Sequence, residues 1–253
     1  MSLRLAAAAC IVACALAAGA SGEEIIVVPT RPGVTLALTL VAASGTPRAA
    51  AVLFPGGEGV LSLLRSNFLL RVRGDIAARG IMVAVADAPS DHRAGLDPLY
   101  RASDEAAQDI AAIVAGLKRR ADVPMWLVGT SNGSISAASG AVRLGPPRIA
   151  GAVLTSSVWS GGMSYVALEK IAVPVLVVHN RNDGCPSAKF VGAEQAIGRF
   201  AAAPAKELVA VSSSASNGSS CGGLAPHGYY GIEAQVVAAI ADWILAHPPE
   251  ATR

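Results

Sequence analysis

The chain has 253 residues, a length that suits one sizeable α/β domain with a well-buried core. Hydrophobic residues make up 53% of it, charged residues only 15%, and the formal net charge is +2 at pH 7. Because no basic tract stands out and no His, Cys, Asp and Glu residues cluster with ligand spacing, we expect no nucleic-acid partner, no metal and no other cofactor.

The first twenty residues have the pattern of a secretory signal peptide. Arg4 is their only charged residue, and an uncharged, apolar stretch runs from position 5 to an A-x-A cleavage site at Ala18-Gly19-Ala20. We therefore predict a signal peptide at 1–20 and a mature domain at 21–253, located in the periplasm or secreted. Lipidation at Cys14, within Ile11-Val12-Ala13-Cys14, is the second interpretation. No other segment is long and apolar enough to span a membrane, so we expect no stable insertion after cleavage.

Apolar runs and helical segments alternate along the rest of the chain. In chain order we predict strands over 24–28, 35–41 and 48–54, a helix over 68–79, a strand over 81–86, a helix over 103–120, a strand over 124–128, a helix over 132–144, strands over 149–155 and 173–178, a helix over 187–200, a strand over 207–211 and a helix over 231–247. The strands are continuous apolar runs, which is typical of a mostly parallel sheet with helices on both faces. The sequence therefore predicts one α/β domain.

A short glycine-flanked motif lies between the fifth strand and the third helix. Gly129-Thr130-Ser131-Asn132-Gly133 has the G-x-S-x-G pattern of a nucleophile elbow. The turn is so tight that the backbone forces the serine outward, and larger side chains at either glycine would clash. We therefore predict that Ser131 is a catalytic nucleophile.

A serine nucleophile needs a base, and the histidines differ in their suitability. His227 lies in the loop between the last strand and the last helix, where an exposed imidazole could reach a serine at another strand's end. His179 ends a buried strand, which favours a structural role, and His247 ends the last helix. We therefore predict that His227 is the base.

The base needs an acid to orient it. Asp183 lies in the polar turn after the strand 173–178, at the carboxyl edge of the sheet and on the same side as the elbow. Asp87 follows an earlier strand and is the competing candidate. We predict that Asp183 is the acid.

The chain order Ser131, Asp183, His227 is that of the α/β-hydrolase superfamily. Nearly all of the predicted mature chain resembles the small, single-domain serine esterases and the dienelactone-hydrolase-like branch, on the following segments: Phe54-Pro55-Gly56-Gly57, Gly129-Thr130-Ser131-Asn132-Gly133, Asn182-Asp183 and His227-Gly228. Dienelactone hydrolase has a cysteine as its nucleophile, and the serine here favours esters over lactones. The resemblance implies the α/β-hydrolase fold and an oxyanion hole made by the backbone N–H groups of Gly57 and Asn132.

Two further features concern the surroundings of this predicted site. Cys185 and Cys221 are the only cysteines after position 20, and a single pair of cysteines in an exported protein indicates a disulfide, here between the acid and histidine loops.

The connection 156–172 is too short for the helical cap domain that many superfamily members insert, so we expect an open site without a cap. Trp159 and Tyr165, in this connection, are candidate pocket residues.

Together these features predict an exported serine hydrolase. It would cleave carboxylic esters, small or polymeric, through a covalent acyl-enzyme. A peptidase or amidase with the same triad is one alternative, although peptidases of this fold usually carry an extra domain. A non-catalytic binding protein on a hydrolase fold is the other, although such proteins usually lose a triad residue.

Overall fold

The computed structural model describes residues 22–249. The predicted signal peptide at 1–20, and Cys14 within it, lie outside the described residues. Within 22–249, no helix has both the length and the apolar character needed to cross a membrane.

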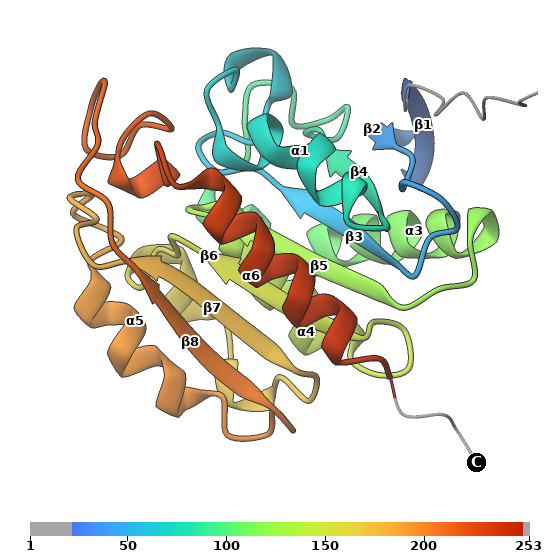
Figure 1. The fold of residues 1–253 in the computed structure, drawn as a ribbon. Helices are drawn as coiled ribbons and strands as arrows, with labels where there is room; N and C mark the ends of the chain where they lie inside the picture. The colour runs from blue at the N-terminus through green and yellow to red at the C-terminus, as the bar shows by residue number, and fades with distance from the viewer. Residues whose placement is uncertain (1–21, 250–253) are drawn as a thin grey trace, which may run out of the picture.

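The core of the molecule is an eight-stranded sheet with the strand order β1-β2-β4-β3-β5-β6-β7-β8 (Figure 1). Its strands are β1 (Glu23–Arg31), β2 (Val34–Val41), β3 (Ala49–Phe54), β4 (Ile81–Ala86), β5 (Met125–Thr130), β6 (Gly151–Thr155), β7 (Val175–Asn180) and β8 (Lys206–Val211). The pairs β1–β2 and β2–β4 are antiparallel, and every other neighbouring pair is parallel. The predicted, mostly parallel sheet is confirmed.

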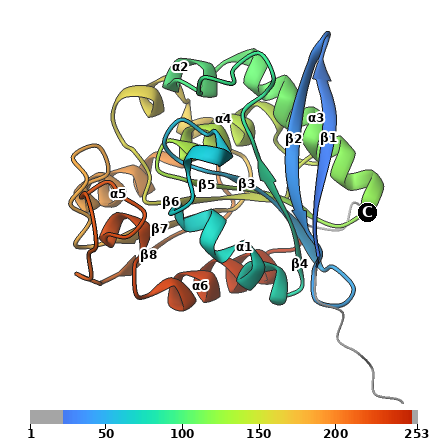
Figure 2. The ribbon, with the colours of Figure 1, turned by 90° about the horizontal axis from the view of Figure 1, so that it is seen from above.

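Helices cover both faces of this sheet (Figures 1 and 2). They are α1 (Phe68–Ala78), α2 (Pro98–Arg101), α3 (Asp104–Arg120), α4 (Gly133–Leu144), α5 (Phe190–Ala196) and α6 (Glu233–Ala246). Helices α1 and α6 lie on one face, and α3, α4 and α5 lie on the other. Alternate residues of β3 enter two separate cores, with Leu53 packed on the α1 and α6 side and Val52 on the other. Because both faces are covered, every residue of the five central strands β3 to β7 is buried, whereas the edge strands β1 and β8 contain exposed, charged residues.

The connection 156–172 contains no cap domain. It forms two short 3-10 helices, Gly161–Tyr165 and Leu168–Lys170, and returns directly to β7. The absence of a cap within the described chain agrees with the sequence prediction, and it leaves the carboxyl edge of β5 and β6 without a covering domain.

Several boundaries differ by one to three residues, and two stretches differ in a way that has a clear physical reason. The helix expected over 187–200 begins only at Phe190, because residues 185–188 form a turn closed by the Ala188 N–H and the Cys185 carbonyl. Between the strand 81–86 and the helix 103–120, where no helix or strand was predicted, the structure contains α2, and Asp97 accepts hydrogen bonds from the N–H groups of Leu99 and Tyr100. Asp before Pro98 is a helix-start signal that was present in the sequence.

Candidate functional site

Ser131 lies in a strained turn between β5 and α4. Its backbone has φ of +53°, a left-handed conformation that few residues other than glycine adopt. Two backbone hydrogen bonds hold it there: the Ser131 N–H donates to the Thr155 carbonyl at 3.0 Å, and the Ser134 N–H donates to the Ser131 carbonyl at 3.0 Å. The partly exposed side chain is thereby presented at the carboxyl edge of the sheet.

The glycines around this turn have no room for a side chain. A Cβ atom at Gly129 would overlap the Gly133 carbonyl group, and one at Gly133 would overlap the Phe54 carbonyl oxygen. A Cβ at Gly56 would lie 2.8 Å from the Ser131 Cβ. The end of β3 therefore packs directly against the elbow, which brings the glycine-rich segment 55–59, here called the oxyanion loop, beside Ser131.

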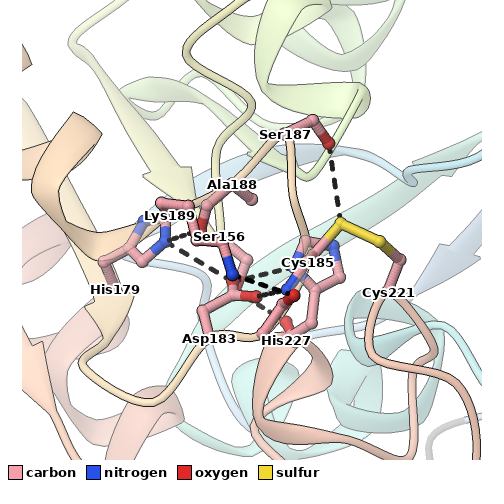
Figure 3. Close-up of a disulfide and its surroundings, with 10 residues drawn as sticks. Ser156, His179, Asp183, Cys185, Ser187, Ala188, Lys189, Cys221 and His227 are labelled. Atoms are coloured by element: carbon pink, nitrogen blue, oxygen red, sulfur yellow. Dashed lines mark hydrogen bonds and ion pairs between the residues drawn. A yellow bond between two sulfur atoms is a disulfide. The ribbon is translucent and has the colours of Figure 1, made fainter.

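The structure pairs His227 with Asp183. The two residues come from the loops after β8 and β7, and His227 Nδ1 lies 2.8 Å from Asp183 Oδ2 (Figure 3). Because an ionised carboxylate can only accept, Nδ1 carries the hydrogen in this bond. The pair is buried, with His227 only 5% exposed, so the exposed imidazole expected from its loop position is not what the structure contains.

His227 is buried because its neighbour Tyr229 is anchored inside the protein. The Tyr229 hydroxyl accepts the Ser156 N–H at 2.7 Å and donates to the Val178 carbonyl at 2.6 Å. The Ser156 hydroxyl donates to the carbonyl of His227 itself at 2.6 Å. These bonds to the ends of β6 and β7 fix the short 3-10 turn Pro226–Gly228 that contains the imidazole.

Asp183 is surrounded by hydrogen-bond donors. Its Oδ1 accepts the Cys185 N–H at 2.9 Å, and its Oδ2 lies 3.4 Å from Nε2 of the fully buried His179. Burial by itself would raise the pKa of Asp183, but hydrogen bonds from His179 and His227 outweigh it and hold the pKa below the usual value. Asp183 is therefore ionised at neutral pH.

His179 has the structural role that its strand position predicted, and it also contacts Asp183. Its Nε2–H donates to the Ala188 carbonyl at 2.7 Å, which ties the turn 185–188 to β7. The same nitrogen faces Asp183, as Figure 3 shows. Sequence reasoning missed this contact, because residues 179 and 183 meet only through the way the chain turns after β7.

Ser131 and His227 line one cavity of about 190 Å³. His227 Nε2 has no hydrogen-bond partner among residues 22–249, so the structure records no bond from it to the Ser131 hydroxyl. Catalytic hydrogen bonds are often long before substrate binds. The other lining residues are uncharged: Gly56, Gly57, Leu63, Leu64, Ser66, Asn67, Phe68, Thr130, Cys221, Gly222, Gly223 and Gly228.

The two candidate pocket residues are not part of this cavity. Trp159 packs against the core on the α3, α4 and α5 side, with its ring centroid 6.4 Å from that of His179. Tyr165 is 64% exposed at the end of the 3-10 helix Gly161–Tyr165. Neither side chain lines the space beside Ser131, where Leu63 and Leu64 are found instead.

Gly57 has the conformation of a fixed turn. Its φ is +54°, and the Gly59 N–H donates to the Gly56 carbonyl at 3.1 Å to close the turn around it. Because the N–H and C=O of a trans peptide point in opposite directions, the Gly57 N–H points away from that turn. Asn132, the second predicted donor, lies immediately before α4, where backbone N–H groups are free to bind an anion.

A buried arginine supports this loop, and no sequence pattern indicated it. Arg101, at the end of α2, is 1% exposed and donates to the Gly57 carbonyl at 3.0 Å and to the Ser136 hydroxyl at 3.1 Å. Burial lowers its pKa to about 10, although the nearby carboxylates of Glu58 and Asp97 oppose the shift. The guanidinium is therefore charged at neutral pH.

The predicted disulfide is present in the structure. Cys185 and Cys221 are joined with their Cα atoms 4.6 Å apart, although they are separated by 36 residues in the sequence (Figure 3). The bond links the loop that contains Asp183 to the loop that precedes His227. The two loops that form the buried pair are thereby held together covalently.

We expect the double variant Cys185→Ser, Cys221→Ser to be less stable by about 3–4 kcal/mol, since the bond no longer restricts the unfolded chain. Urea unfolding of oxidised wild type and variant measures the difference. Dithiothreitol should lower the stability of wild type to that of the variant and leave the variant unchanged. Equal stability of the oxidised wild type and the double variant would contradict the prediction.

The comparisons with known proteins agree with this architecture. No protein-family model matches the sequence, and no curated protein does. Solved structures do match. An esterase from Pyrococcus furiosus has a TM-score of 0.67 at 14% identity, over 90% of this chain and 93% of that one. A dienelactone hydrolase from Anabaena variabilis has a TM-score of 0.66 at 16% identity, over 90% of this chain and 99% of that one. An α/β serine hydrolase without a lid, from Xanthomonas campestris, has a TM-score of 0.63 at 12% identity, over 91% of this chain and 97% of that one.

The arrangement is suited to nucleophilic chemistry. Within residues 22–249, no group of three or more His, Cys, Asp and Glu side chains is placed to hold a metal ion. The site combines Ser131 in a strained backbone conformation, the His227 imidazole with a free Nε2, and the ionised Asp183 carboxylate hydrogen-bonded to Nδ1 of that imidazole. These are the parts needed for attack by a hydroxyl on an electrophilic carbonyl.

Proposed function

Because the chain has the α/β-hydrolase fold, we propose that it is an exported serine hydrolase that cleaves carboxylic esters through a covalent acyl-enzyme. The observation that supports this most strongly is the buried His227–Asp183 hydrogen bond of 2.8 Å, in which the imidazole lines the same cavity as Ser131. Nε2 of this imidazole has no hydrogen-bond partner within 22–249, so its lone pair is free to accept a proton.

In the proposed reaction the Ser131 hydroxyl attacks the ester carbonyl while His227 Nε2 takes its proton. Asp183 stabilises the resulting imidazolium through Nδ1–H. The carbonyl oxygen becomes an oxyanion and accepts hydrogen bonds from the N–H groups of Gly57 and Asn132. His227 then returns the proton to the leaving alcohol, which leaves an acyl group on Ser131. Water, activated by the same imidazole, hydrolyses this acyl-enzyme and restores the serine.

The cavity favours an uncharged acyl group. Its lining contains no aspartate, glutamate, lysine or arginine, so it offers no counter-ion for a carboxylate or an ammonium group. Leu63, which is 66% exposed, and Leu64 provide apolar contact at this space. With no cap domain between β6 and β7, the alcohol portion of a small or a polymeric ester could extend into solvent.

The proposed location is the periplasm or the exterior of the cell. It rests on the signal-peptide pattern of residues 1–20, with residues 21–253 as the mature domain. The Cys185–Cys221 disulfide is compatible with this location, since such bonds persist in oxidising compartments.

Labelling with a fluorophosphonate probe tests the proposed chemistry. We expect one label per folded chain, located by peptide mass spectrometry on Ser131, because the probe reacts with serines activated in this way. A p-nitrophenyl ester series from acetate to laurate should be turned over and should compete with the label, with preference for the shorter acyl groups. Folded protein that neither binds the probe nor hydrolyses esters would favour the non-catalytic alternative, and turnover of peptide anilides alone would favour an amidase.

A further inference from the structure

Arg101 is a buried cation that makes no direct ion pair within the described chain, although the carboxylates of Glu58 and Asp97 are near it. It is 1% exposed, it forms no salt bridge with the carboxylates of residues 22–249, and its Nε–H has no partner there. Removing a charge from water is unfavourable, and replacing a buried charged group by an apolar side chain of similar volume is often neutral or stabilising. Packing alone therefore does not account for an arginine at this position.

Its two hydrogen bonds join the two segments that contain the proposed oxyanion donors. One runs to the Gly57 carbonyl at 3.0 Å, in the oxyanion loop. The other runs to the Ser136 hydroxyl at 3.1 Å, in the first turn of α4, whose N-cap residue is Asn132. The Asn132 side chain also donates to the Gly57 carbonyl, at 3.4 Å. The guanidinium thus bridges the loop after β3 and the helix after the elbow.

Gly57 requires such support because glycine has no conformational preference of its own. Its φ of +54° is readily exchanged for negative values in a free chain. Arg101 and Asn132 both donate to the Gly57 carbonyl, in addition to the backbone bond that closes the turn from Gly56 to Gly59. The turn also packs closely on the guanidinium, since a Cβ at Gly59 would lie 2.7 Å from Arg101 Nη2.

We propose that Arg101 is a positioning residue for the oxyanion hole, which fixes the Gly57 carbonyl, and through the Gly57 Cα the adjacent peptide that carries the N–H donor, and sets a fixed positive charge beside the loop. This proposal rests on the function proposed above. Preorganised donors and charges stabilise an oxyanion more than they stabilise the neutral ester. Arg101 therefore acts on the transition state and contributes little to ground-state binding.

The variants Arg101→Met and Arg101→Lys test the proposal against the control Leu99→Ala, an exposed residue of the same short helix. For Arg101→Met we expect kcat to fall roughly 10–100-fold with KM nearly unchanged, somewhat less than the loss of an oxyanion donor itself. Affinity for an alkyl boronic acid, which mimics the tetrahedral intermediate, should fall in parallel. Arg101→Lys retains the charge and one donor and should recover part of the loss, whereas Leu99→Ala should match wild type.

Amide hydrogen exchange supplies a measurement that does not depend on catalysis. In Arg101→Met, the amide hydrogens of residues 56–59 should exchange with solvent faster than in wild type. The midpoint of global unfolding should stay equal to that of wild type or rise. Unchanged exchange in this loop would overturn the positioning role. Faster exchange with wild-type kcat would overturn its catalytic consequence. An inactive wild type would instead contradict the proposed function itself, and this is seen before any variant is made.

Discussion

Ser131→Ala should lower kcat/KM for a p-nitrophenyl ester by roughly 10⁵-fold or more, as is typical when the nucleophile of a serine triad is removed. The proposed reaction has no other route to an acyl-enzyme, because His227 would have no hydroxyl to deprotonate. Steady-state hydrolysis of p-nitrophenyl acetate and butyrate measures the loss. The unfolding midpoint should change little, since alanine keeps the backbone bonds that define the elbow.

The matched control for this variant is Ser44→Ala. Ser44 is exposed in the loop before β3, at the opposite edge of the parallel strands from the elbow. This substitution should leave kcat/KM within about two-fold, since exposed substitutions away from a site have small effects. Ester hydrolysis by Ser131→Ala at the wild-type rate, with normal folding, would overturn the assignment of the nucleophile.

Asp183→Asn should lower kcat by roughly 10⁴-fold while leaving the fold intact. An asparagine side chain can still accept the Cys185 N–H, which the carboxylate accepts now at 2.9 Å. It cannot stabilise an imidazolium. Its amide group can also donate to Nδ1 of His227, which would place the imidazole hydrogen on Nε2 and remove the free lone pair needed for proton transfer. Kinetics with p-nitrophenyl butyrate, together with an unfolding curve, separate the catalytic loss from any loss of stability.

Asp87→Asn is the comparison variant for this experiment, because Asp87 is the competing candidate for the catalytic acid. In the structure its Oδ1 accepts the N–H groups of Leu61 and Ala88, at 2.9 and 2.8 Å, and an asparagine oxygen can accept both. We expect a loss of less than about ten-fold, in line with a neutral replacement that preserves both hydrogen bonds. A large loss in Asp87→Asn beside a small one in Asp183→Asn would reverse the assignment of the acid.

Local features of the chain allowed most of the fold to be predicted. The strand 81–86 was placed with the observed bounds, and the helix over 103–120 was placed within one residue, because Ser103 caps it through the Ala106 N–H. The helix over 187–200 was predicted too long, because nothing in the sequence shows that Ala188 is held by His179. The Ser103 cap is a local signal, whereas the bond that ties the turn 185–188 to β7 reaches back nine residues and has no local pattern.

The same distinction applies to the candidate site. The elbow could be read from five consecutive residues, since a Cβ at Gly129 would overlap Gly133 of the same turn, although the lack of room at Gly133 is set by the distant Phe54. The order of Ser131, Asp183 and His227 and the pairing of the only two cysteines after position 20 were likewise accessible, because chain order and residue type need no coordinates.

Tertiary structure alone decided how these groups are held. His227 is buried because Tyr229 bonds to Val178 of β7 and Ser156, just after β6, bonds to the His227 carbonyl, across 51 and 71 residues of sequence. Arg101 meets Gly57 across 44 residues. Such contacts have no local pattern. They depend on which strand ends the parallel sheet brings to one edge. The hydrogen bonds formed there keep Asp183 ionised despite its burial, and those of Arg101 support the oxyanion loop.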